Sequence, residues 1–103
     1  MTTALEKVRR LEKYLTVDQP TTNPVFDLAL DKLLTHEKKR LQSSKERLTN
    51  QLREFEQQYH LSSQSFYPMY ERGEMGDDLD YIEWASTMEM ITNIEKRLAL
   101  LEE

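Results

Sequence analysis

The chain of 103 residues contains no cysteine, only two glycines and three prolines, and no long apolar run. The lack of cysteine excludes disulfides, thiolate metal sites and cysteine nucleophiles. No segment approaches the roughly 20 consecutive apolar residues of a membrane span. Charged residues interrupt the segment between Glu6 and Arg10 before an apolar run forms, so we expect no signal peptide and a cytoplasmic setting.

The composition is typical of long, partly solvated helices. Hydrophobic residues make up 38% of the chain and charged residues 32%. Helices that bury only one stripe need less apolar mass than a compact core. We therefore predict an all-α fold in a single helical domain, residues 1–103.

Three helices are predicted from apolar spacing and capping residues. Leu5, Val8, Leu11 and Leu15 recur in steps of three and four, which predicts a short helix over about 3–15. A long helix over about 24–59 begins with Asn23 as N-cap and Pro24 at the first helical position, and lacks internal Gly or Pro. A C-terminal helix is predicted over about 78–102.

Two heptad columns predict how the long helices pair. The seam contains apolar residues that recur every seven positions, together with Leu52 of the second column. Its residues are Leu34, Leu41, Leu48, Leu52, Phe55, Ile91 and Leu98. Such a seam predicts a long antiparallel helical hairpin, coiled-coil-like, and we expect it to dimerise through the same seam. The pattern does not separate a seam used within one chain from one used between two.

The connector over about 60–77 holds both glycines. A short helical turn is predicted from Ser65 to Gly73. Gly73 and Gly76 permit positive backbone φ, which a sharp helix junction needs. Asp77 is predicted to complete this junction by capping the C-terminal helix, with Asp80 in its first turn.

Charge is distributed unevenly along the chain. Residues 1–53 carry 11 Lys+Arg against 7 Asp+Glu, a net of +4, whereas residues 54–103 carry 3 against 12, a net of −9. This split suits either two halves that lie against each other or an acidic half that meets a basic partner. The basic stretch over 36–48 has interleaved acids and no aromatic residue, so we expect a solvated helix face and no direct nucleic-acid binding.

The acidic cluster before Trp84 has several interpretations. Helix initiation alone accounts for its acids. A divalent-metal site would use Asp77, Asp78, Asp80 and Glu83, but their spacing lacks the alternating pattern of a calcium loop. A partner-binding surface would combine acids that steer a basic protein with aromatic anchors. Its candidate residues are Phe66, Tyr67, Tyr70, Asp77, Asp78, Asp80, Tyr81, Glu83 and Trp84.

The order of residues in "SFYPMYERGEMGDDLDYIEWAS" resembles a known family signature. It is similar to the C-terminal signature of small bacterial and archaeal helical proteins encoded beside a compact toxin, in particular the antitoxins of Tum-type toxin–antitoxin pairs. The matching residues are Phe66, Tyr70, Gly73, Gly76, Asp77, Asp80, Glu83 and Trp84. The resemblance implies a protein that silences a ribonuclease-like toxin and performs no chemistry itself. No DNA-binding module is readable at the N-terminus, unlike in many antitoxins.

The sequence therefore favours a non-enzymatic, antitoxin-like binding module that blocks a small basic ribonuclease-type toxin by steric and electrostatic means. The first alternative is a self-associating structural or adaptor coiled coil. The second is an acidic-loop metal binder. No catalytic residue, metal ligand or cofactor is assigned, because no triad, phosphate loop or pocket-forming pair of carboxylates is present.

Overall fold

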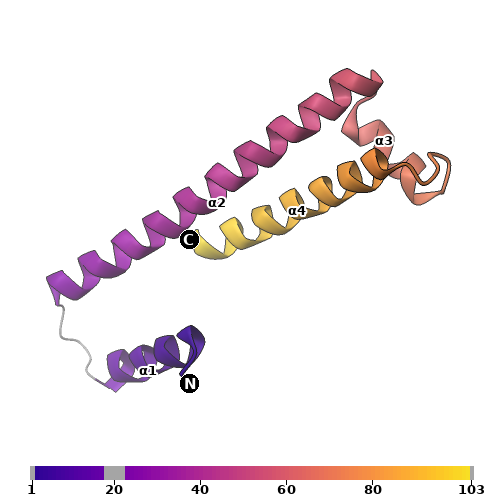
Figure 1. Cartoon of the computed structure of the whole chain (residues 1–103). Coiled ribbons are helices and arrows are strands. Elements are labelled where there is room, and N and C mark those ends of the chain that lie inside the picture. The colour runs from indigo at the N-terminus through magenta and orange to yellow at the C-terminus, as the bar shows by residue number, and fades with distance from the viewer. Residues whose placement is uncertain (1, 18–22, 103) are drawn as a thin grey trace. The chain divides into compact units, whose positions relative to one another are not determined.

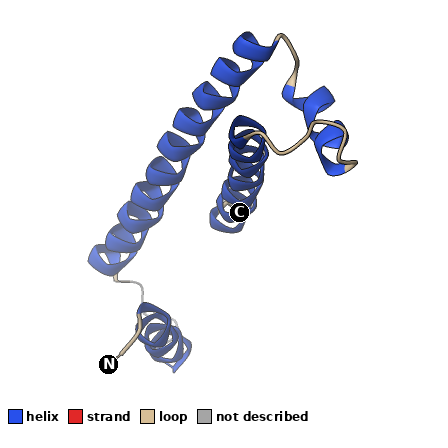
Figure 2. Ribbon diagram, turned by 45° about the vertical axis from the view of Figure 1, so that its right-hand side comes forward, coloured by secondary structure: helices blue, strands red, loops and turns tan. Residues whose placement is uncertain are grey.

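The computed structural model describes residues 2–17 and 23–102, which form helices joined by turns and loops (Figures 1 and 2). The helices are α1 (Ala4–Val17), α2 (Pro24–Tyr59), α3 (Ser63–Glu71) and α4 (Leu79–Leu101). The all-α prediction is confirmed. The chain divides into two compact units, Met1–Leu33 and Leu34–Glu103.

The first two helices begin at the residues that cap them. The hydroxyl of Thr3 accepts a hydrogen bond from the Glu6 backbone N–H at 3.1 Å. The side chain of Asn23 accepts hydrogen bonds from the N–H groups of Val25 at 3.1 Å and Phe26 at 3.3 Å. These contacts satisfy donors that a helix start otherwise leaves unpaired. α2 then continues for 36 residues, a length of about 54 Å.

Within residues 34–103, α2 and α4 form the predicted antiparallel hairpin. Leu41, Leu48, Ile91 and Ile94 are buried together, and Leu52, Leu98 and Leu101 pack against them. The heptad seam is therefore filled by the chain itself over most of its length. This corrects its prediction as an oligomer seam, because buried leucines offer no surface to a second chain. Leu34 alone among the predicted seam residues is exposed, at 43%.

A second core closes the end of the hairpin where α3 lies. Its buried residues are Phe55, Phe66, Trp84 and Ala85. The rings of Phe66 and Trp84 stack in parallel with centroids 3.9 Å apart, and Phe55 stacks on Trp84 at 5.6 Å. One aromatic stack thus joins α2, α3 and α4.

Two left-handed residues shape the turns on either side of α3. His60 has φ +52°, and the next N–H, that of Leu61, bonds to the Glu56 carbonyl at 3.3 Å. Gly73 has φ +74°, and the next N–H, that of Glu74, bonds to a carbonyl five residues earlier at 2.9 Å. Both arrangements are Schellman-type helix ends. The predicted positive φ is present at Gly73 and also at Gly76, at +83°.

The predicted connector contains the complete helix α3. Ser62 caps it by accepting a hydrogen bond from the Ser65 N–H at 3.1 Å. The predicted start at Ser65 is therefore wrong, because Pro68 stands inside the helix rather than in its first turn. Among the described residues, no helix has the length and apolarity required to cross a bilayer.

Candidate functional site

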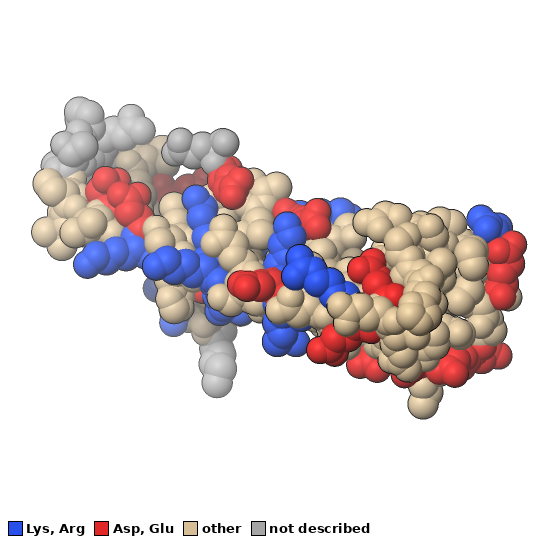
Figure 3. Space-filling view, turned by 90° about the horizontal axis from the view of Figure 1, so that it is seen from above, with Lys and Arg blue, Asp and Glu red and all other residues tan. Residues whose placement is uncertain are grey.

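The end of the hairpin formed by α3, the loop after it and the start of α4 is strongly acidic. Between residues 71 and 83 the sequence has six carboxylates and one cation, Arg72, a net charge of −5. Five of the carboxylates are exposed, and we call these the acidic elbow: Glu71, Glu74, Asp77, Asp78 and Glu83. In Figure 3, carboxylates gather over this end of the hairpin.

Asp78, and not Asp77, caps α4. The Asp78 side chain accepts a hydrogen bond from the Asp80 backbone N–H at 2.9 Å, and its extended backbone precedes the first helical residue. The prediction that Asp77 caps this helix is therefore wrong. Gly76 and Asp77 lie before the cap. Asp77 and Asp78 are neighbours in the sequence, and the spacing of apolar residues does not show which of the two is the N-cap.

Asp80 faces the hairpin rather than solvent. It is half-buried, and its carboxylate accepts hydrogen bonds from the hydroxyl of Tyr59 and, at 3.5 Å, from the amide of Gln58. The hydrogen bond to Asp80 is the main reason that the pKa of Tyr59 rises to about 12, because ionised tyrosine loses this bond and is repelled by the carboxylate. Asp80 thus fixes the start of α4 to the end of α2.

Two elbow acids also have partners within the chain. Glu83 accepts a hydrogen bond from the amide of Gln51 at 2.9 Å. Arg72 donates two hydrogen bonds to Glu74 at 3.0 and 3.1 Å, which lowers the pKa of the Glu74 carboxyl. In the described part of the chain, the carboxylates of Glu71 and Asp77 have neither a hydrogen bond nor an ion pair.

The aromatic candidates separate into core and surface. Phe66 and Trp84 are fully buried at 0% exposure, so their prediction as partner anchors is wrong. The indole N–H of Trp84 donates to the hydroxyl of Ser63 at 2.9 Å. Tyr67, Tyr70 and Tyr81 are half-buried beside the elbow and pack against the second core. The Tyr67 hydroxyl donates to Glu89 at 2.9 Å, which raises the pKa of Tyr67.

Sequence reasoning did not identify the polar residues that hold this end together. Ser63 is 2% exposed, and its backbone N–H donates to the Glu56 carboxylate at 2.7 Å. Glu56 therefore ties α2 to the start of α3, and Ser63 ties α3 to Trp84. The serine cluster "SSQS" after Leu61 signalled a cap, but nothing in its pattern showed that one serine faces an indole.

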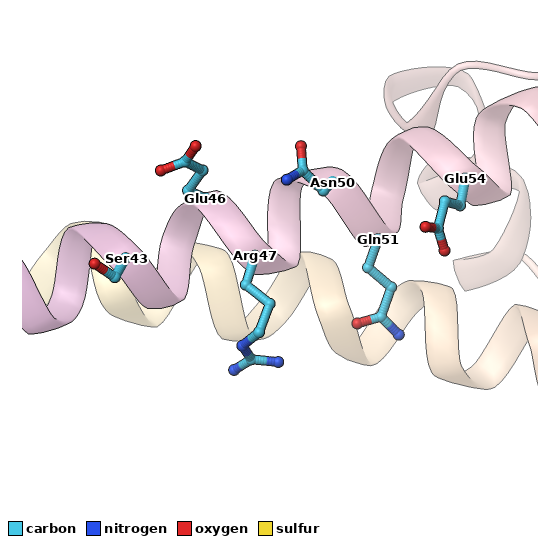
Figure 4. Close-up of a pocket in the computed structure, with 6 residues that line it drawn as sticks. All are labelled: Ser43, Glu46, Arg47, Asn50, Gln51 and Glu54. Atoms are coloured by element: carbon cyan, nitrogen blue, oxygen red, sulfur yellow. The ribbon is translucent and has the colours of Figure 1, made fainter.

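A shallow hollow on α2 has a polar lining. It is formed by Ser43, Glu46, Arg47, Asn50, Gln51 and Glu54 (Figure 4). These side chains come from successive turns of one helix, with Arg47 and Gln51 extending to one side and Glu46 and Asn50 to the other. Small-molecule sites are usually concave and lined mostly by apolar groups. The hollow has the character of a solvated helix groove.

The acids of the elbow do not converge on one point. Among the described residues, no three His, Asp or Glu side chains form a group that would hold a metal ion. The predicted alternative of a divalent-metal site is therefore not supported. The chain matches no protein-family model, no curated protein and no solved structure.

Proposed function

We propose that this is a non-enzymatic cytoplasmic binding protein whose acidic elbow docks on the basic face of a small ribonuclease-type toxin. The observation that carries the proposal is the net charge of −5 between residues 71 and 83, where five of the six carboxylates are exposed at one packed end of the hairpin. The resemblance of the segment from Phe66 to Trp84 to antitoxin signatures supports the choice of partner.

The elbow contains more acid than its fold uses. One cap requires one carboxylate, supplied by Asp78. Glu71 and Asp77 have no partner in the described part of the chain, yet they stand beside four further acids, where like charges repel. A cationic partner would turn this repulsion into attraction.

The core beneath the elbow favours binding with little rearrangement. The stack of Phe66 on Trp84 and the Ser63 hydrogen bond fix α3 against α4. A surface presented in one conformation loses less entropy on binding than a mobile loop. Tyr67, Tyr70 and Tyr81, which are half-buried and held against the core, supply the rigid aromatic residues that interfaces favour.

The proposed mechanism is occupancy. A ribonuclease attracts a polyanion, so its substrate face is basic. An acidic protein seated on that face excludes RNA sterically and neutralises the field that attracts it. Long-range attraction also accelerates encounter, and salt weakens this effect.

The first test is co-purification of the tagged chain from its native cell through a high-salt wash. We expect one small basic protein in a fixed ratio, with ribonuclease activity that the chain suppresses. Recovery of the chain without such a partner, or with a partner that still cleaves RNA while bound, would reject the proposal.

The second test maps the interface with the double variant Glu71→Arg and Asp77→Arg. Neither side chain supports the fold in the described structure, so helicity should stay unchanged. At about 0.2–1 kcal/mol for each exposed charge pair, the dissociation constant should rise about 2- to 30-fold at low salt. Glu46→Arg, an exposed reversal on α2 of the same unit, is the matched control and should leave affinity almost unchanged.

A further inference from the structure

The unit over residues 1–33 has an apolar face on each of its helices. At about 100° per residue, the leucines and valine of α1 fall within an arc of about 120°. They are Leu5, Val8, Leu11 and Leu15, and they are 39–58% exposed. Val25, Phe26, Leu30 and Leu33 of α2 fall within an arc of about 140°. Together these eight residues form what we call the N-terminal apolar face.

The described part of the chain leaves most of this face exposed, with only Phe26 and Leu30 half-buried. No residue of α1 is buried. In α2, burial begins at Leu41, and both core clusters draw their buried residues from Leu41 onward. Val25 is 78% exposed and Leu33 56%. Amphipathic stripes of this kind normally face a core.

The exposed area is that of a small specific interface. Dividing the free energy of burying a Leu or Val side chain by the free energy per unit of apolar area gives about 100 Å² of apolar surface for each fully exposed side chain. The N-terminal apolar face therefore holds on the order of 400 Å² per chain. The smaller specific interfaces bury about 600 Å² on each partner. About two thirds of a homodimer interface is apolar, which is about 400 Å² of such an interface on each partner. The area of the N-terminal apolar face matches this value.

Charge favours a second copy of the chain as the occupant. Residues 1–33 contain 5 Lys+Arg and 5 Asp+Glu, a net of zero, whereas residues 34–103 contain 9 against 14, a net of −5. Two copies that meet through the neutral unit avoid the repulsion between their acidic units. A neutral unit is also poorly suited to an anionic membrane surface, which recruits helices rich in Lys and Arg.

We propose that the protein is a homodimer whose interface is the N-terminal apolar face. Each chain contributes α1 and the first turns of α2, so two chains supply four helices around a shared core. Each apolar stripe spans about 120–140° of its helix, so a single facing helix would cover only part of it. A bundle of four helices can bury the full width of every stripe. The acidic elbow belongs to the other unit, so this proposal does not depend on the proposed function.

Sedimentation equilibrium of the full chain tests the proposal. We expect a mass twice the 12.3 kDa of one chain at micromolar concentrations. Val8→Glu should raise the dimer dissociation constant about 100-fold, because symmetry places the charge in the interface twice. Val17→Glu makes the same exchange on the opposite face of α1 and should leave the mass unchanged. A monomeric parent chain, or equal effects of both variants, would overturn the proposal.

Thiol alkylation gives a second test that leaves the helices intact, because the chain has no cysteine of its own. In the dimer, the alkylation rate of Val8→Cys should fall as protein concentration rises, while that of Val17→Cys should stay constant. Protection at position 8 that is independent of concentration would show that the chain covers its own face. No protection would show that nothing covers it. Either result would refute the dimer.

Discussion

The hydrogen bond between Trp84 and Ser63 gives the sharpest prediction about stability. Ser63 is 2% exposed and Trp84 0%, and the indole N–H reaches the serine oxygen at 2.9 Å. Ser63→Ala removes this acceptor and leaves too little space for a water molecule to replace it. An unsatisfied buried donor costs about 1–3 kcal/mol. At about 4–8 °C per kcal/mol for a unit of this size, a loss of 2 kcal/mol lowers Tm by about 8–16 °C.

Urea unfolding followed by fluorescence measures this loss directly, because Trp84 is the only tryptophan. Ser65→Ala is the matched control, because Ser65 lies in the same first turn of α3 and is exposed. Its hydroxyl and its backbone N–H form hydrogen bonds with the side chain of Ser62. We expect the free energy of unfolding to fall by at least 1 kcal/mol more for Ser63→Ala than for Ser65→Ala, with an unchanged m-value. A difference below about 0.5 kcal/mol would refute the claim that this bond supports the elbow.

Three further perturbations test other parts of the structure. Because the pKa of Tyr59 is raised to about 12 from about 10 in an unfolded chain, its contribution to stability is complete below pH 10 and is lost between pH 10 and 12. A tyrosinate absorbance titration should show a late-ionising group that Tyr59→Phe removes, and its absence in the parent would contradict the hydrogen bond. Asp78→Ala should cost about 1 kcal/mol through loss of the α4 cap, and Asp77→Ala less than about 0.5 kcal/mol, as thermal unfolding would show; equal costs would contradict the cap assignment. Leu48→Ala, at a residue 2% exposed, should destabilise by about 2–5 kcal/mol. Leu100→Ala, at a residue 85% exposed, should change the free energy of unfolding little. Chemical denaturation measures both values, and similar losses of stability at the two sites would contradict the hairpin core.

The helices of the hairpin were predictable because helix capping and apolar spacing depend on residues close in the sequence. The start of α2 followed from Asn23 and Pro24, and its uninterrupted length followed from the lack of Gly and Pro up to Tyr59. Sevenfold spacing identified Leu41 and Leu48 as core residues. These signals are carried by residues close in sequence, where helix geometry relates spacing directly to a common face.

The site was less predictable because its contacts join residues far apart in the chain. Trp84 meets Phe66 across 18 positions and Ser63 across 21. A loop between α3 and α4 interrupts the helix, so spacing along the sequence does not relate these residues. Aromatic residues in an acidic segment therefore suggested surface anchors, although burial places Trp84 and Phe66 in the core. Of the five exposed acids, Asp77, Asp78 and Glu83 were predicted as surface candidates, whereas Glu71 and Glu74 were not. Only tertiary contacts show that Asp80, also predicted, faces the hairpin.

Competition with RNA tests the central claim most directly. The ribonuclease that co-purifies with the chain should be assayed for RNA cleavage at several RNA concentrations and two salt concentrations, with the parent chain and with the Glu71→Arg, Asp77→Arg variant. Occupancy by the acidic elbow predicts inhibition that excess RNA relieves, that higher salt weakens and that the variant largely loses at low salt. Inhibition that RNA does not relieve, or that the parent and the variant produce equally, would contradict an elbow seated on the substrate face.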